Sequence, residues 1–219
     1  ITPRTLTVAI GTPAVSSGSF SSTTPKWGDT DGVITPPTMS TPGTWAYTSP
    51  GTYITVVNGQ LHAIGKGTET ITATYTPTDT TNYNTYTTTF DVTTSSSAVS
   101  AGSISTYMTF TLNGTSYSKG AVVYLPFNTS YTITFAFTAG HTASSITVDG
   151  TAYTGSGLAN ILASGFSLST GTSTNHSLQQ VDTAATYTFS FDSNSGSSVS
   201  SISVTYGGNI AIPSNPTKN

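Results

Sequence analysis

Apolar and polar residues alternate along most of the chain, and a period of two is the pattern of a half-buried β-strand. Near the start, Leu6, Val8 and Ile10 would share one face of such a strand, while Thr5 and Thr7 would share the other. The same alternation recurs at residues 70–75, 86–92, 108–112, 131–137, 187–191 and 202–206. Because β-branched and aromatic residues dominate these segments, the pattern predicts an all-β protein.

Turn signals separate several of these segments. Three of them are Asn58-Gly59, Asn113-Gly114 and Asp149-Gly150. Such pairs suit the positive φ angles of a two-residue hairpin turn of type I′. With that turn in the first hairpin, Val56 would pair with Leu61 and Ile54 with Ala63, so that four apolar residues share one face. We expect Tyr117 to pair with Phe110 by the same logic.

The alternation also suggests two domains. Residues 96–103 are rich in Ser and Ala with little to bury, and we interpret them as a linker. We expect one β-sandwich at residues 1–95 and a second at residues 104–219, with residues 158–163 able to form only a helical turn or two. The expected first core is Trp45, Ile54, Val56, Leu61 and Ile71, and the expected second core is Phe110, Ile133, Phe135, Phe189 and Val204.

Composition narrows the range of functions. Charged residues make up 6% of the chain, against roughly 25% in an average soluble protein. Ser and Thr together fill 81 of 219 positions, so hydroxyl groups supply most of the polar surface. With a net charge of -3 and no basic patch, we expect no nucleic-acid partner. No apolar run is long enough to span a bilayer, so we expect no membrane insertion, and the absence of Cys excludes disulfides.

The first half of the chain resembles a known family. Residues 44–49 read TWAYTS, and residues 54–73 read ITVVNGQLHAIGKGTETITA. A Trp strand, a hairpin turning at Gly and a final G-x-G-T-x-T-I-T-A resemble the bacterial Ig-like domains of group 2. Residues 1–8 and 75–84 also resemble related tandem Ig-like repeats of large bacterial surface proteins. The resemblance covers about residues 1–95.

This resemblance implies an immunoglobulin-like sandwich that acts as a spacer or adhesive module on cell surfaces and on phage particles, without catalysis. It does not extend to the second half of the chain. We therefore expect an extracellular location, on a cell surface or a virus particle. A chain that begins with Ile1 rather than Met fits a cleaved precursor or a segment of something longer.

Several residues could bind a ligand, and each also has a structural explanation. Trp27 lies in a predicted loop, where it could contact a ligand or lie over the end of the sandwich. Trp45 could be a sugar platform, but its alternation with Tyr47 favours packing in the core. Residues 29–32 (DTDG) open like a calcium loop, yet the third acidic ligand and the distal Glu are missing, which favours an ordinary turn. Asp79, followed by asparagines, also favours a turn.

Catalytic and metal motifs are missing from the sequence. His62, His141 and His176 are far apart, without the spacing of a zinc site, and there is no G-x-S-x-G motif. We expect no catalytic residues, no metal and no cofactor. Glycosylation sequons begin at Asn113, Asn128 and Asn175, no more than the Ser and Thr content predicts by chance.

Two functions remain open. One is a non-enzymatic structural protein, a subunit or spacer of a surface filament, surface layer or virus particle that associates with itself or with neighbouring subunits. The alternative is an adhesin or a receptor- or carbohydrate-binding protein, with the second domain as its binding tip. For the first, the strand with Leu6, Val8 and Ile10 could pair with the next subunit by β-augmentation, or it could close its own sandwich.

Overall fold

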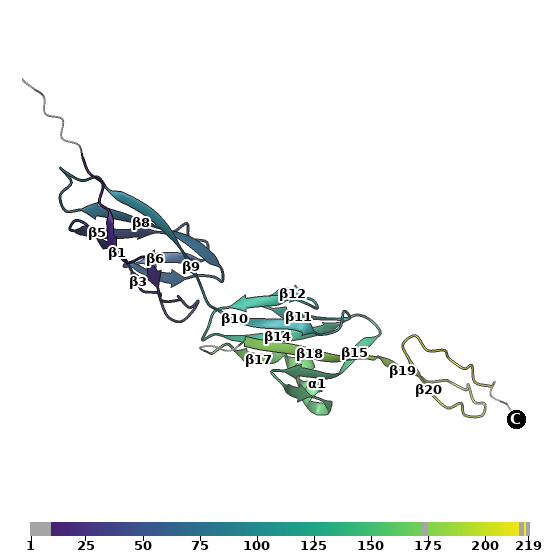
Figure 1. The fold of residues 1–219 in the computed structure, drawn as a ribbon. Coiled ribbons are helices and arrows are strands. Elements are labelled where there is room, and N and C mark those ends of the chain that lie inside the picture. The colour runs from purple at the N-terminus through teal and green to yellow at the C-terminus, as the bar shows by residue number, and fades with distance from the viewer. Residues whose placement is uncertain (1–9, 172–174, 215–216, 218–219) are drawn as a thin grey trace, which may run out of the picture. The chain divides into compact units, whose positions relative to one another are not determined.

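The computed structural model of the chain describes residues 10–171, 175–214 and 217. Strands and bridges make up 52% of the described residues and helix 5%, which confirms the prediction of an all-β protein. The chain divides into two compact units, each described separately below (Figure 1). Unit 1 comprises Ile1–Ala98, Val123–Thr129 and Ser169–Asn175, and unit 2 comprises Val99–Val122, Ser130–Leu168 and His176–Asn219. Two short segments of the second half of the sequence thus belong to unit 1.

Short strands and one three-stranded sheet build the first part of the chain. Its strands are β1 (Val15–Ser17), β2 (Ser21–Ser22), β3 (Ile34–Thr35), β4 (Thr38–Met39), β5 (Gly43–Thr48), β6 (Ile54–Val57), β7 (Gln60–Ala63), β8 (Thr68–Pro77) and β9 (Tyr86–Thr93). The three-stranded sheet has the order β5-β8-β9, and the pairs β6-β7, β1-β4 and β2-β3 form two-stranded sheets. Within the larger sheet both neighbouring pairs are antiparallel, as short connections allow.

Strand β8 lies at the centre of that sheet and shows the predicted period of two. Ile71, Ala73 and Tyr75 are buried, while Thr72 and Thr74 between them are only partly buried. The predicted β6–β7 hairpin is also confirmed, because Val56 pairs with Leu61 and Ile54 with Ala63. The buried core of this unit is Ile54, Leu61, Ile71 and Val92, and Val56 packs against it only partly buried.

Trp45 is half-buried in an aromatic cluster beside this core. Its ring lies 4.8 Å from that of Phe20, at 80°, and 5.0 Å from that of Tyr75. The Phe20 ring in turn stacks on Phe90, with ring centroids 4.6 Å apart. Trp45 therefore packs as predicted, but at the edge of the core, and Phe20, which has no alternating neighbours, escaped the sequence pattern.

Glu69 is a buried carboxylate on the apolar face of β8. Its two oxygens accept hydrogen bonds from the four backbone N–H groups of residues 51–54, at 2.5 to 3.1 Å, and from the Ser49 hydroxyl at 3.1 Å. Burial by itself raises the pKa of Glu69, but the backbone hydrogen bonds outweigh burial, so that pKa lies below its usual value. The carboxylate thereby fixes the loop that leads into the β6–β7 hairpin.

The second part of the chain holds two larger sheets and one helix. Its strands are β10 (Ser97–Ser103), β11 (Met108–Leu112), β12 (Thr115–Tyr117), β13 (Val122–Leu125), β14 (Ser130–Phe137), β15 (His141–Val148), β16 (Thr151–Tyr153), β17 (Phe166–Ser169), β18 (Asn175–Ala184), β19 (Thr186–Phe189) and β20 (Ile202–Thr205). One sheet has the order β13-β10-β18-β15-β16, the second β12-β11-β14-β17, and β19-β20 stand as a pair. The predicted pairing of Phe110 with Tyr117 is confirmed.

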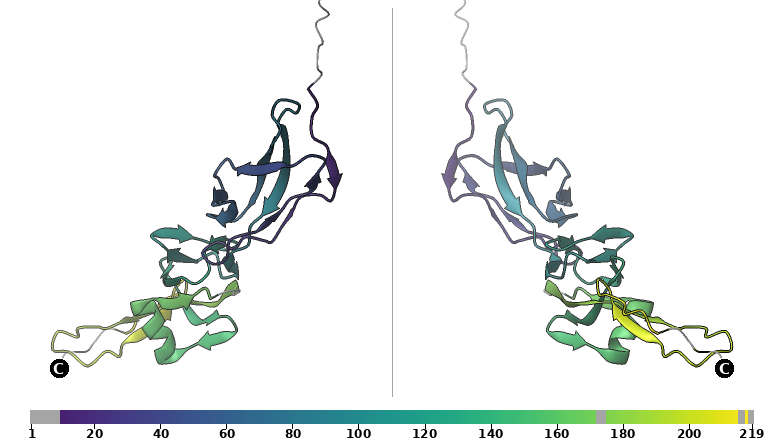
Figure 2. Two further views of the ribbon diagram at one scale, coloured as in Figure 1. Left: turned by 90° about the vertical axis from the view of Figure 1, so that its left-hand side faces the viewer. Right: turned by 90° about the vertical axis from the view of Figure 1, so that its right-hand side faces the viewer.

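Helix α1 (Gly155–Ser164) contains the predicted helical segment but begins earlier, and its 10 residues make nearly three turns at about 3.6 residues each. Leu158 and Ile161 are its buried side chains, spaced three apart on one face. The helix contacts β14 of one sheet and β15 of the other. Figure 2 shows it on the outside of unit 2, consistent with its exposed outer face.

Two other expectations need correction. The stretch 96–103, interpreted as a linker, forms β10, in which Ser97, Val99 and Ala101 are buried. Small side chains occur both in close-packed sheets and in flexible linkers, so composition alone could not distinguish a strand from a linker here. Phe189, expected in the second core, is 42% exposed, because β19 pairs only with β20. Phe110 and Ile133 are fully buried as predicted, whereas Phe135 and Val204 are partly buried.

We expect Glu69→Gln to destabilise unit 1. The new amide places an NH₂ group where one oxygen accepts two backbone N–H groups, and each unsatisfied buried group costs about 1 to 3 kcal/mol. The free energy of unfolding should fall by at least about 2 kcal/mol at pH 7. Trp27 and Trp45, the two tryptophans of the chain, both lie in unit 1, so their fluorescence during urea titration reports its unfolding.

The effect should depend on pH in one direction. Because the folded state lowers the pKa of Glu69, its contribution is present above the unfolded pKa of about 4.3 and is lost as pH falls through the folded value. The difference between Glu69→Gln and the parent chain should therefore shrink in acid. Asp91→Asn, at an exposed carboxylate, is the control and should change stability by less than about 0.5 kcal/mol. Equal stability of Glu69→Gln and parent at pH 7 would contradict this account.

Candidate functional site

The predicted subunit-contact strand lies mostly outside the described residues. Leu6 and Val8 are not described, and Ile10 is exposed. The next residue, Gly11, forms a parallel bridge with Tyr83, and its N–H donates to the Asn82 carbonyl at 2.9 Å. The chain therefore pairs within its own unit from Gly11 onward, and exchange of the strand before it stays a prediction.

Trp27 is half-buried, and its backbone is held at both polar groups. Its N–H donates to the Ser95 carbonyl at 2.9 Å, and its carbonyl accepts from the Phe127 N–H at 2.7 Å. The neighbouring acidic residues do not converge: Asp29 lies 3.7 Å from Lys26, and Asp31 contacts His62. No group of three or more His, Asp or Glu side chains that could hold a metal ion occurs within the described part of the chain.

The three sequon asparagines, Asn113, Asn128 and Asn175, are all exposed. Asn113 has φ +52° in the β11–β12 turn, as predicted for an Asn-Gly hairpin. The Asn128 side-chain amide donates to Asp29 Oδ1 at 3.2 Å, so this side chain already has a structural partner within unit 1.

Each of the three histidines contacts one aspartate through Nδ1. The pairs are His62–Asp31 at 2.8 Å, His141–Asp182 at 2.9 Å and His176–Asp149 at 2.6 Å. A carboxylate can only accept, so Nδ1 carries the proton in each pair and the Nε2 of a neutral ring is left as an acceptor. His176 Nε2 is buried with no hydrogen-bond partner among the described residues, so the serine of a catalytic triad is missing there.

A cluster of rings in unit 2, which we call the ring ledge, comprises Tyr107, His141 and Tyr206. The Tyr107 and His141 rings stack, with centroids 3.6 Å apart and an angle of 9° between their planes. The Tyr206 ring lies 5.9 Å from His141 at 57°. Tyr107 is 44% exposed and Tyr206 is 55% exposed, so this arrangement is open to solvent.

A second exposed feature is the hairpin face, the four apolar residues on one side of the β19–β20 pair. Tyr187 pairs with Val204 and Phe189 with Ile202, so all four share one face, while Thr and Ser residues occupy the other. Tyr187 and Phe189 are 47% and 42% exposed, although both belong to strands. An isolated two-stranded hairpin is at best marginally stable in water, so a layer packed on this face would stabilise it.

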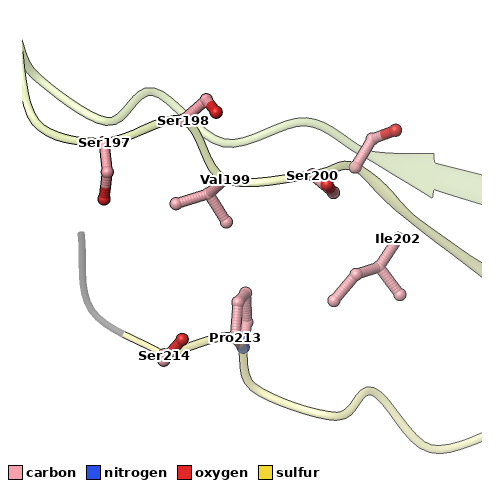
Figure 3. Close-up of a pocket in the computed structure, with 8 residues that line it drawn as sticks. Ser197, Ser198, Val199, Ser200, Ile202, Pro213 and Ser214 are labelled. Atoms are coloured by element: carbon pink, nitrogen blue, oxygen red, sulfur yellow. The ribbon is translucent and has the colours of Figure 1, made fainter.

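A pocket of about 290 Å³ lies beside the hairpin, lined by residues 197–202 together with Pro213 and Ser214. Figure 3 shows the side chains of Val199, Ile202 and Pro213 turned toward one another across it. Five of these eight lining residues are serines and none is ionisable, so the pocket offers no side chain for acid–base chemistry.

A pocket of about 470 Å³ in unit 1 is lined by Ser40, Thr41, Pro42, Thr78, Asp79 and Tyr83. Asp79 accepts hydrogen bonds from the Asn82 side chain at 2.7 Å and from the backbone N–H groups of Asn82 and Thr81 at 3.1 Å each. The Asn82 side chain is the main reason that the pKa of Asp79 is lowered. This carboxylate caps a turn, as the sequence suggested.

Comparison of the chain with protein-family models, with curated proteins and with solved structures finds no match in any of the three. The resemblance to group 2 bacterial Ig-like domains therefore stays a prediction. No helix in the described residues is long and apolar enough to cross a membrane.

We expect Phe189→Ser to leave the sheets of unit 2 intact, because this residue lies outside their core. The free energy of unfolding, followed by circular dichroism in urea, should change by less than about 0.5 kcal/mol at protein concentrations low enough to prevent association. Phe110→Ala, at a fully buried position, should instead cost roughly 3 to 5 kcal/mol. A loss of similar size at Phe189 would show that the hairpin belongs to the core.

Proposed function

We propose that the chain is a non-enzymatic extracellular structural protein, built of two β-sandwich domains of which the first is immunoglobulin-like. Its role would be that of a subunit or spacer in a surface filament, a surface layer or a virus particle. Self-association through the hairpin face would join neighbouring copies.

The hairpin face is the observation that carries this proposal. Tyr187, Phe189, Ile202 and Val204 form one continuous apolar side of a strand pair that no third strand extends among the described residues. Burial of apolar surface stabilises by about 25 cal/mol per Å², so covering these side chains is favourable. The opposite face of the strand pair carries Thr and Ser hydroxyls, so only the hairpin face gains from an apolar partner.

A second copy of the chain is the occupant that the charges favour. Residues 183–214 contain Asp192 as their one charged residue, so two hairpin faces can approach without the repulsion that keeps most surfaces apart. The chain as a whole carries only 13 charged residues, of which 5 are Lys or Arg and 8 are Asp or Glu. The hairpin face therefore offers almost no opposite charge to a highly charged partner.

Support for the immunoglobulin-like part comes from the segments that carry the resemblance. Residues 54–63 form a hairpin that turns at Gly59, as in the family pattern, and Trp45 packs beside the core. In the G-x-G-T motif, a Cβ on Gly67 would lie 2.5 Å from the Tyr53 ring, so only glycine fits. These local features agree with the family pattern and support the proposal of an immunoglobulin-like sandwich.

Sedimentation velocity over a range of concentrations tests self-association. We expect the parent chain to sediment faster as concentration rises, and the double variant Tyr187→Ser/Phe189→Ser to remain a monomer, because two large side chains leave the hairpin face. Thr188→Ala, on the opposite face of the same strand, is the matched control and should associate like the parent.

Three results would count against this interface. A parent chain that stays monomeric at all concentrations would contradict self-association. Unchanged association of the double variant would place the contact elsewhere. A chain that lacks residues 1–10 but folds and no longer associates would assign the contact to the first strand instead.

A further inference from the structure

We propose that the ring ledge of unit 2 binds a neutral pyranose sugar of a glycan. In this site Tyr107 and Tyr206 would stack on the sugar, and Asp182 and His141 would hydrogen-bond its hydroxyl groups. The proposal goes beyond the structural role above and does not depend on it, because the ledge and the hairpin face consist of different residues.

The backbone holds the ledge in place before any ligand binds. The Thr138 N–H donates to the Tyr107 carbonyl at 2.8 Å. The Ala185 N–H donates to the Gly140 carbonyl at 2.9 Å, and the Tyr206 N–H donates to the Ala185 carbonyl at 2.8 Å. Four segments far apart in sequence, at residues 107, 138–140, 185 and 206, are thereby fixed side by side. Such preorganisation lowers the entropy cost of binding.

Gly140 lets the second tyrosine approach. A Cβ on Gly140 would lie 2.4 Å from the Tyr206 ring, and its φ of +84° is one that other residues rarely adopt. The Tyr206 ring therefore lies directly against the backbone, beside His141. With Tyr107 stacked on His141, the ledge presents two partly exposed tyrosine rings around one imidazole.

Polar groups accompany these rings. Asp182 Oδ2 accepts from His141 Nδ1 at 2.9 Å, and the Gln180 amide lies 3.4 Å from Asp182 Oδ1. The side chains of Asp182 and His141 are 27% and 18% exposed, so both can reach a ligand. Pyranose rings have an apolar C–H face that stacks on aromatic rings and hydroxyls at their edges that donate to carboxylates, which matches this combination.

Charge favours a neutral sugar over an acidic one. Lys119 is the only Lys or Arg among the described residues of unit 2, and Asp182 at the ledge would repel a carboxylate or sulfate. A protein partner is also disfavoured, because it would have to bury the Asp182 carboxylate, which costs several kcal/mol when no cation accompanies it. Sugar hydroxyls instead replace the water around that carboxylate.

Titration of the ¹⁵N-labelled full chain, followed by NMR, tests the site. The neutral probes are maltohexaose, cellohexaose, chitohexaose and galactobiose, and 3′-sialyllactose is the acidic probe. We expect at least one neutral probe to shift the amide signals of Tyr107, His141, Asp182 and Tyr206, with saturation at millimolar concentrations. The acidic probe should leave these signals unchanged.

Variants connect the shifts to the ledge. Tyr107→Ala should weaken binding at least tenfold, and Gly140→Ala, which keeps every polar group but displaces the Tyr206 ring, should weaken it as well. Tyr124→Ala removes a tyrosine that is 50% exposed but lies on β13, outside the ledge, and should bind like the parent. Unchanged positions of the other amide signals show that each variant is folded.

Several outcomes would overturn the proposal. They are no shift with any neutral probe, shifts confined to residues outside the ledge, equal binding by Tyr107→Ala and the parent, and a response to 3′-sialyllactose alone. None of these outcomes bears on sedimentation of the hairpin-face variants, so the two proposals can fail separately.

Discussion

Backbone hydrogen bonding between strands, with only one face of each strand apolar, is the constraint on which the rest of this structure depends. In β8 the buried side chains alternate with threonines, and the same period recurs in β11 and β14. Threonine suits both roles, because its β-branched side chain favours strands while its hydroxyl meets the solvent. The chain therefore needs few charges to stay folded, and its surfaces lack the repulsion that charges give.

Local pattern predicted those parts of the fold that local forces determine. The registers of the β6–β7 and β11–β12 hairpins followed from two-residue turns, whose Asn and Gly residues do have positive φ. Strand β10 escaped prediction because Ser and Ala fit a packed sheet as well as a linker. The burial of Glu69 was not predicted, because the backbone N–H groups that stabilise its carboxylate belong to a loop 15 to 18 residues earlier in the chain. Phe189 alternates correctly, but alternation cannot tell whether another layer covers the face.

The candidate sites were harder to predict than the fold. The ring ledge joins Tyr107, His141 and Tyr206, which are far apart in sequence and follow no motif. Its one local signal in the sequence is Gly140, directly before β15, because the Tyr206 ring packs against this residue where a Cβ would clash. Trp27, which the sequence left open between a ligand contact and packing over the end of the sandwich, is half-buried and held by its backbone. Exposed aromatics that the fold brings together are thus candidate binding surfaces that sequence spacing does not reveal.

The central claim is that a second copy of the chain covers the hairpin face. Hydrogen–deuterium exchange of the parent chain, measured by mass spectrometry at low and at high protein concentration, tests it most directly. The account predicts that amides of β8 and β11 are protected at both concentrations, whereas amides of β19 and β20 exchange rapidly when dilute and slow markedly when concentrated. Protection of β19 and β20 that is the same at both concentrations would contradict it.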